Sequence, residues 1–203
     1  LSYVYSDLPY FLLKFYLEKK YQLSLDTQIK NYLYDKIGST SLTYKPTNFL
    51  DKKLIVPTAV DDYFRFNLVE GHVHDMGAAM MDGISGHAGL FGNSLDIAKI
   101  LQLFLQKGSY ANEKFFDEKF FDLFNFRHFK EKKVRRGIGF DKPELDPDDP
   151  NTCGCASDKS FGHYGFTGSV AWVDPESEII CVFLSNRTFP EENNNSLSEF
   201  NIR

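Results

Sequence analysis

A histidine set between glycines is the feature of this sequence best suited to chemistry. It lies in the tetrapeptide Gly162-His163-Tyr164-Gly165. Histidine changes charge near neutral pH and both donates and accepts hydrogen bonds, so it can serve as an acid, a base or a recognition group. The surrounding stretch 160–187 is rich in β-branched, aromatic and turn residues. It predicts two strands joined by a tight turn, with the histidine where the first strand begins.

A second group, His72, His74 and Asp75, has the residue types that bind metals. A binuclear zinc hydrolase needs an aspartate two residues after the second histidine and another histidine directly behind it. Met76 and Gly77 occupy those places. We therefore expect hydrogen-bonded structural histidines and no metal. A metal-dependent hydrolase using His72, His74 and Asp75 is kept as an alternative.

Motifs for a serine nucleophile are incomplete in these 203 residues. The sequence Gly83-Ile84-Ser85-Gly86 lacks the last glycine of the G-x-S-x-G nucleophile elbow, and no S-x-x-K occurs. The nearby His87 is interpreted as a structural residue that supports this glycine-rich turn. On motifs alone, then, no serine is activated by a recognisable neighbour.

Several helices must position these residues. Apolar spacing predicts helices over 8–20 and 24–37, the first with a buried face and the second ended by Gly38. A third begins at the N-cap candidate Asn93 and stops at Gly108. A Phe-rich amphipathic helix is expected over 115–129. The intervening stretches are interpreted as a long connection (39–67), a Gly- and Ala-rich segment (71–92) and a polar loop (141–160).

Composition narrows the class of protein. The chain is 42% hydrophobic with a net charge of −5, which fits a globular protein without general attraction for nucleic acid. The one dense basic run, Lys130 to Arg136, is interpreted as a solvated face or loop. No apolar run approaches the ~20 residues of a membrane span. Three cysteines give no disulfide framework.

The order of motifs resembles the serine β-lactamase and penicillin-binding protein superfamily. Tyr5-Ser6-Asp7 immediately precedes a helix, and Gly-His-Tyr-Gly follows about 155 residues later, like that superfamily's Y-x-N and K-T-G motifs. GHVHD, SGHAGLFGNSLDIAKILQLFLQKG and FGHYGFTGSVAWVDPE lie between and after them. The resemblance covers nearly the whole chain. It is strongest to class C-like β-lactamase-related proteins, of the kind fused to a glycosidase domain in Bacteroidetes-type bacteria.

This resemblance implies a fold and a set of roles. The fold is mixed α/β, with an antiparallel sheet, flanking helices and a helical subdomain that carries Tyr5. Tyr5 takes the role of general base or proton relay, and Asp7 stands where an asparagine holds substrate. His163 takes the place of the K-T-G lysine as a cationic or hydrogen-bonding group. The remaining substrate-binding residues, with an oxyanion-hole backbone donor among the last two, are Tyr164, Gly165, Phe166 and Thr167.

Three departures from the family pattern shape the expected activity. The S-x-x-K segment precedes Y-x-N in this family, so we expect the catalytic serine and lysine to lie outside this chain. Asp7 adds a negative charge in place of asparagine, and Tyr164 replaces a threonine. Histidine in place of lysine occurs in the peptidase and esterase branches, which points away from antibiotic hydrolysis.

The resemblance implies that residues 1–203 form a single partial β-lactamase-like domain, which lacks the S-x-x-K segment and the C-terminal helix. The parent is expected to be a D,D-peptidase, esterase or β-lactamase-related hydrolase acting through an acyl-serine, with no cofactor. This chain alone is expected to be inactive. Bacterial periplasm or envelope is the implied location, and peptidoglycan-derived peptides are the implied substrates.

One alternative is a non-catalytic binding or accessory module attached to a glycosidase. Asp7 and Tyr164 would then mark a decayed site. An incomplete sheet would also leave open edges and apolar surface, so self-association is a further expectation.

Overall fold

The computed structural model describes residues 3–146, 148, 151–193 and 196–199, which form two compact units. The first unit holds the described residues up to Asn93 and from Asn186 to Ser196; the second holds those from Ser94 to Ser185 and from Leu197. Each unit buries its own apolar side chains. Within the described residues, no helix has the length and apolarity needed to cross a bilayer.

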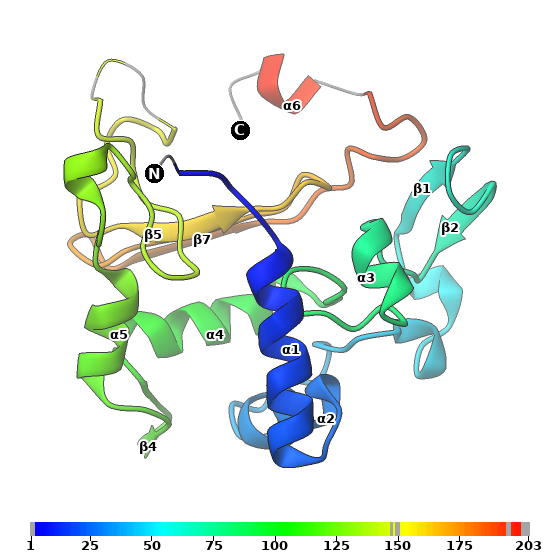
Figure 1. The fold of residues 1–203 in the computed structure, drawn as a ribbon, viewed down its shortest axis with the longest axis horizontal. Coiled ribbons are helices and arrows are strands. Elements are labelled where there is room, and N and C mark those ends of the chain that lie inside the picture. The colour runs from blue at the N-terminus through cyan, green and yellow to red at the C-terminus, as the bar shows by residue number, and fades with distance from the viewer. Residues whose placement is uncertain (1–2, 147, 149–150, 194–195, 200–203) are drawn as a thin grey trace. The chain divides into compact units, whose positions relative to one another are not determined.

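The first unit is mainly helical, with one small β-hairpin (Figure 1). The β1–β2 pair is antiparallel; β1 lies inside the segment 39–67 that was predicted to be a long connection, and β2 begins at its last residue. Its elements are α1 (Leu8–Tyr21), α2 (Leu25–Ile29), a π-helix (Lys30–Tyr34), two 3₁₀ turns (Pro46–Asn48 and Lys52–Leu54), β1 (Pro57–Asp61), β2 (Asn67–Glu70) and α3 (Met76–Met80).

Helix α1 confirms the predicted span but not the predicted buried face. Its apolar residues surround the helix instead of forming a stripe, and Leu12, Leu13 and Phe15 are each more than half exposed. The buried residue of α1 is Lys14, whose ammonium pairs with Glu18 at 2.9 Å. The helix ends at Gln22, which adopts the left-handed conformation.

The helix predicted over 24–37 is divided. Regular α-helix stops at Ile29, and a π-helical turn continues to Tyr34, so the 3.6-residue spacing no longer holds. Along this segment Tyr32 is 59% exposed, while Tyr34 and Ile37 are buried. Gly38 follows with φ of 65°, as expected of a residue that ends a helix.

The second unit contains the sheet that carries His163. Strands β5 (Phe161–Tyr164), β6 (Val170–Asp174) and β7 (Ile179–Phe183) form an antiparallel sheet in that order. The other elements are α4 (Ser94–Leu105), β3 (Ser109–Tyr110), β4 (Glu113–Lys114), α5 (Glu118–Asn125) and a 3₁₀ turn (Lys130–Lys132); a short α6 spans Ser196–Glu199.

The prediction of two strands over 160–187 was therefore wrong, because the stretch forms three. A turn interrupts the first predicted strand, where Gly165 N–H donates to Ser169 O at 2.7 Å and Gly168 N–H donates to Gly165 O at 3.0 Å. Gly168 has a φ of 101°, which glycine alone adopts readily. The turn at 174–178 before the last strand agrees with the sequence.

Helix α4 packs on this sheet through a phenylalanine-rich core (Figure 1). Leu101 of α4 and Phe121 of α5 meet Phe161 of β5 and Val173 of β6 in one buried cluster. α4 begins directly after Asn93, as predicted, whereas α5 is much shorter than the helix predicted over 115–129. This buried cluster holds β5 in place through Phe161.

Close backbone approach at Gly162 locks β5 against β6. A Cβ atom at this position would lie 2.3 Å from Ala171 O and 2.6 Å from Cγ of Trp172, so no other residue fits without displacement. Trp172 is 8% exposed, and its ring centroid lies 5.5 Å from that of Tyr164. Gly162 therefore sets the position of the next residue, His163.

Candidate functional site

The predicted site residues fall into two sets, one in each unit. Tyr5 and Asp7 belong to the first unit, while His163, Tyr164 and the residues after them belong to the second. Tyr5 is 55% exposed, so its phenol is accessible to solvent. Asp7 is the N-cap residue of α1, but its side chain makes no capping bond; the Leu8 N–H donates to Ser6 Oγ instead, at 3.3 Å.

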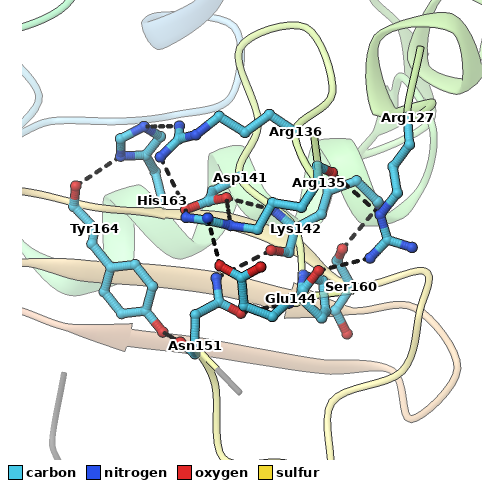
Figure 2. A network of polar contacts seen from close by, with 11 residues as sticks. Arg127, Arg135, Arg136, Asp141, Lys142, Glu144, Asn151, Ser160, His163 and Tyr164 are labelled. Carbon is cyan, nitrogen blue, oxygen red and sulfur yellow. Dashed lines mark hydrogen bonds and ion pairs between the residues drawn. The ribbon is translucent and has the colours of Figure 1, made fainter. Parts of the chain in front are cut away.

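His163 is held through both ring nitrogens. Nδ1 lies 2.7 Å from the carbonyl oxygen of Tyr164, and Nε2 lies 3.1 Å from Nη1 of Arg136 (Figure 2). A carbonyl can only accept and a guanidinium can only donate, so Nδ1 carries the proton and Nε2 is the acceptor. Of the two roles expected for His163, cationic or hydrogen-bonding, this geometry favours the hydrogen-bonding one.

The Tyr164 side chain is partly buried and its hydroxyl is bonded to the backbone of the 141–160 loop. Its hydroxyl donates to the backbone oxygen of Asn151 at 2.5 Å, and burial raises its pKa above the ordinary tyrosine value. The phenol therefore stays protonated and ties the 141–160 loop to β5 (Figure 2). The structure gives Tyr164 an anchoring role beside the substrate-binding role that the resemblance implied.

The residues expected to supply an oxyanion hole form the turn between β5 and β6. Phe166 is 53% exposed and Thr167 is partly buried, between Gly165 and Gly168. A Cβ atom at Gly165 would have only ordinary contacts, 3.5 Å at the nearest, so this glycine is not required by close packing. The turn therefore lies next to the histidine strand, with Phe166 at the surface of the unit.

His163 is linked through Arg136 to an ion-pair network centred on Asp141. Asp141 is 2% exposed and receives Arg135 through two bonds, Nε to Oδ1 at 2.7 Å and Nη2 to Oδ2 at 2.9 Å. Arg136 Nη2 reaches the same Oδ2 at 3.1 Å, and Arg135 Nη1 also contacts Glu144 at 2.6 Å. The Asp141 backbone pairs with Gly162, which docks the segment on β5.

This network adds to one prediction. The basic run Lys130 to Arg136 was interpreted as a solvated face or loop, and it is a loop after a short 3₁₀ turn, but Arg135 and Arg136 are partly buried in ion pairs. The signal that could have revealed them is an arginine pair followed by Asp141 across the glycine-rich stretch Gly137–Gly139. Glycines let such a segment fold back so that the arginines reach the carboxylate.

Lys142 follows Asp141 and is buried, with Nζ 2.7 Å from Asn125 Oδ1 and 3.0 Å from Ser160 O. Burial and the nearby Arg127 charge lower its pKa to about 8. A cavity of about 810 Å³ borders Lys142 and Arg127, and the described residues lining it include none of the motif residues. Its ammonium is satisfied by these oxygens, so we assign Lys142 a structural role.

The metal alternative is not supported by the geometry. Within the described part of the chain, no three His, Cys, Asp or Glu side chains converge as a metal site requires. His72 is exposed, and His74 lies 3.8 Å from Glu192. Asp75 is used locally: it accepts the Ala78 N–H at 2.6 Å as the N-cap of α3. His72, His74 and Asp75 do not form one ligand set.

A Ser-His-Asp chain does occur in the first unit. Ser85 Oγ lies 2.8 Å from Nδ1 of His87, and Nε2 of His87 lies 2.9 Å from Oδ1 of Asp75. Burial opposes ionisation of Asp75, but the Ala78 N–H and His87 outweigh it and keep its pKa below the usual value. Ser85 is 1% exposed. A nucleophile must reach its substrate, so this chain of bonds is structural, as expected for His87.

Comparison with known proteins identifies the family. The β-lactamase family model matches residues 2–201, so the chain belongs to that family, whose members are serine hydrolases. A Bacillus subtilis protein named N-acetylmuramyl-L-alanine amidase is 33% identical over 96% of this chain and 47% of its own length. A Salmonella agona protein named "Putative D-alanyl-D-alanine carboxypeptidase" is 30% identical over 92% and 45%.

Solved structures share the fold at lower identity. A β-lactamase from Mycobacterium bovis matches with a TM-score of 0.62 and 15% identity, covering 98% of this chain and 65% of that one. A penicillin-binding protein homologue from Caulobacter crescentus gives 0.56 and 14%, over 83% and 48%. These confirm the β-lactamase/transpeptidase-like fold. The chain spans about half the length of the curated relatives it matches.

Proposed function

We propose that this chain is part of a serine acyl hydrolase that acts on peptidoglycan-derived peptides through an acyl-serine. The observation that carries the proposal is the placement of two motifs: Tyr5 immediately before α1, and His163 on β5 with both nitrogens engaged. The names of the two curated relatives, an amidase and a carboxypeptidase of cell-wall components, support this substrate class.

Each residue has a role in this proposal. Tyr5 takes the proton from the attacking serine and returns it to the leaving group, for which its exposed phenol is suited. Asp7 orients the substrate by hydrogen bonds. His163, whose two ring nitrogens bond to the Tyr164 carbonyl and to Arg136, positions that arginine and the end of β5 beside the substrate. A backbone N–H of the Phe166–Thr167 turn stabilises the oxyanion, as a preorganised donor does in acyl transfer.

The nucleophile lies outside this chain in the proposal. Because these 203 residues contain no S-x-x-K, the chain by itself is inactive and forms a partial domain. An acyl hydrolase of this substrate class works in the periplasm or cell envelope, and it needs no cofactor.

Fluorescent penicillin tests the proposal directly. The full-length gene product is expected to form a stoichiometric acyl adduct on a serine outside this chain and to release D-alanine from a D-Ala-D-Ala peptide. The 203-residue chain is expected to do neither. Tyr5→Phe in the full-length product should reduce turnover by about 100-fold or more, since general-base catalysis contributes about 10²–10⁴-fold.

Two outcomes would count against it. A stable adduct on the isolated chain would show that it holds its own nucleophile. A full-length product that neither labels nor hydrolyses the peptide would favour the non-catalytic accessory module over the hydrolase.

A further inference from the structure

Two of the three cysteines lie in the 141–160 loop, which Tyr164 ties to β5. Cys153 and Cys155 are both exposed and both carry free thiols, with Gly154 alone between them. Gly154 has a φ of 77°, so the chain folds back at this residue. The S–H of Cys155 donates a hydrogen bond to the sulfur of Cys153. The two sulfur atoms are therefore in contact at the surface of the second unit.

The segment that holds this pair is fixed on both sides. Before it, the backbone oxygen of Asn151 accepts the Tyr164 hydroxyl at 2.5 Å, which ties the chain to β5 (Figure 2). After it, Ser157 Oγ donates to Asp174 Oδ1 at 2.6 Å, and the Ser157 N–H donates to Oδ2 at 3.1 Å, which ties the chain to the end of β6. Five residues lie between these two anchors, so the fold restricts the positions of both thiols.

The two thiols differ in how readily they ionise. The Cys155 S–H and the backbone N–H groups of Cys155 and Ala156 all donate to the Cys153 sulfur, and these bonds lower the pKa of Cys153. The same contact with Cys153, together with the negative charge of Asp174, raises the pKa of Cys155. Cys153 is therefore the more nucleophilic thiol of the pair. An accessible, readily ionised cysteine beside a second thiol is the arrangement found in redox-active dithiols.

We propose that Cys153 and Cys155 form a thiol–disulfide exchange site, separate from the proposed hydrolase site, whose substrates are small-molecule disulfides. The Cys153 thiolate attacks one sulfur of the substrate, so that a mixed disulfide forms and the other half leaves as a thiolate that takes up a proton. Cys155 then loses its proton to water and attacks the Cys153 sulfur. This step forms the Cys153–Cys155 bond and releases the second half as a thiol. In total, two electrons and two protons pass from the dithiol to the substrate.

The exchange is expected to be reversible. A disulfide that spans a single glycine closes a small ring, and departure from relaxed disulfide geometry makes the bond easier to reduce. An excess of thiol should therefore return the pair to its dithiol form.

Peptide mapping of the full-length gene product tests the proposal. Trypsin cuts after Arg136 and Lys159 but not before Pro143, so both thiols fall in peptide 137–159, while Cys181 falls in peptide 160–187. The native protein is treated with glutathione disulfide, and the remaining free thiols are alkylated before digestion. Peptide 137–159 should then be found unalkylated and lighter by two hydrogens, with two thiols of glutathione released for each peptide oxidised. Excess reduced glutathione should reverse the change.

Single variants separate the roles of the two thiols. Cys155→Ser should accumulate the mixed disulfide of Cys153 with glutathione, because no second thiol remains to displace it. Cys153→Ser should react with glutathione disulfide about threefold or more slowly than Cys155→Ser, because fewer N–H groups donate to the thiol that remains. Cys181→Ser is the matched control: it removes an exposed cysteine of β7 and should leave the oxidation of peptide 137–159 unchanged.

Three results would overturn the proposal. A peptide 137–159 that keeps both free thiols would show that the pair does not exchange with disulfides. A mixed disulfide that persists on the unsubstituted protein would show that Cys155 does not reach Cys153. Equal reaction rates for Cys153→Ser and Cys155→Ser would show that the fold does not activate Cys153. None of these measurements involves hydrolysis, so the exchange site and the proposed hydrolase function are tested separately.

Discussion

Asp75 Oδ1 lies 2.9 Å from Nε2 of His87, and Nδ1 on the other edge of the same ring lies 2.8 Å from Ser85 Oγ. These hydrogen bonds connect Ser85 and His87 of the glycine-rich segment 83–92 to Asp75. The Phe11 ring of α1 covers His87 at 4.7 Å between centroids. The same residue types that perform catalysis elsewhere serve here as an internal tie.

Replacing His87 should therefore destabilise the first unit. His87→Ala leaves Ser85 and Asp75 without their shared partner, and unmade buried hydrogen bonds cost about 1–3 kcal/mol each. Chemical denaturation should show a loss in this range. His72→Ala, at an exposed histidine of the same unit, is the control and should change stability little. Similar losses of unfolding free energy for both variants would mean that the Ser85–His87–Asp75 hydrogen bonds do not stabilise the unit.

Gly162→Ala should destabilise the second unit. The added methyl group would meet Ala171 O and the Trp172 ring well inside contact distance, and overpacking of this kind costs about 1–3 kcal/mol. Gly165→Ala, where the nearest atom is 3.5 Å away, should be tolerated. Thermal unfolding followed by circular dichroism separates the two. If they unfold together, close approach at Gly162 is not limiting.

Asp174 makes the β6–β7 turn sensitive to acid. Burial opposes its ionisation, but bonds from Ser157, Glu176 and Ser177 outweigh this and lower its pKa to about 2. The unfolded value is about 3.9, so the carboxylate stabilises the fold above about pH 4, and this contribution is lost as pH falls toward 2. The stability difference between the wild type and Asp174→Asn should follow that course in urea titrations. A difference independent of pH would contradict it.

Lys142 should produce a slope of the same sign at alkaline pH, because the folded state again binds fewer protons than the unfolded state. Its pKa of about 8 in the fold lies below about 10.4 in the unfolded chain. Between these values the unfolded state binds more protons, so stability rises with pH. Relative to Lys142→Met, the wild type should gain stability from pH 7 to 10 in denaturant titrations. A constant difference would show that the ammonium is not shifted.

Local signals in the sequence predicted much of the fold. Apolar spacing predicted the span of α1, Gly38 was predicted to end the second helical segment, and Asn93 was predicted to precede α4. The motifs also predicted the family, which the comparison confirmed. These features depend on neighbouring residues, or on a fixed order of motifs, and both can be read from one chain.

What could not be predicted depends on contacts between distant residues. Nothing near Arg136 in the sequence indicates His163, 27 positions away, because the fold brings them together only when Asp141 pairs with Gly162. The exposed face of α1 has a similar origin, since apolar spacing shows that residues are apolar and not whether a partner covers them. The site residues assigned by resemblance remain predictions.

Trp172 gives the β5–β6 hairpin an optical reporter. It is the single tryptophan of the chain, nearly buried, and packed against Gly162 next to His163. Selective excitation of indole therefore monitors this strand pair alone, against a background of 11 tyrosines. A shift in its emission maximum would report solvent reaching the histidine strand, and quenching could follow the approach of a ligand without any label.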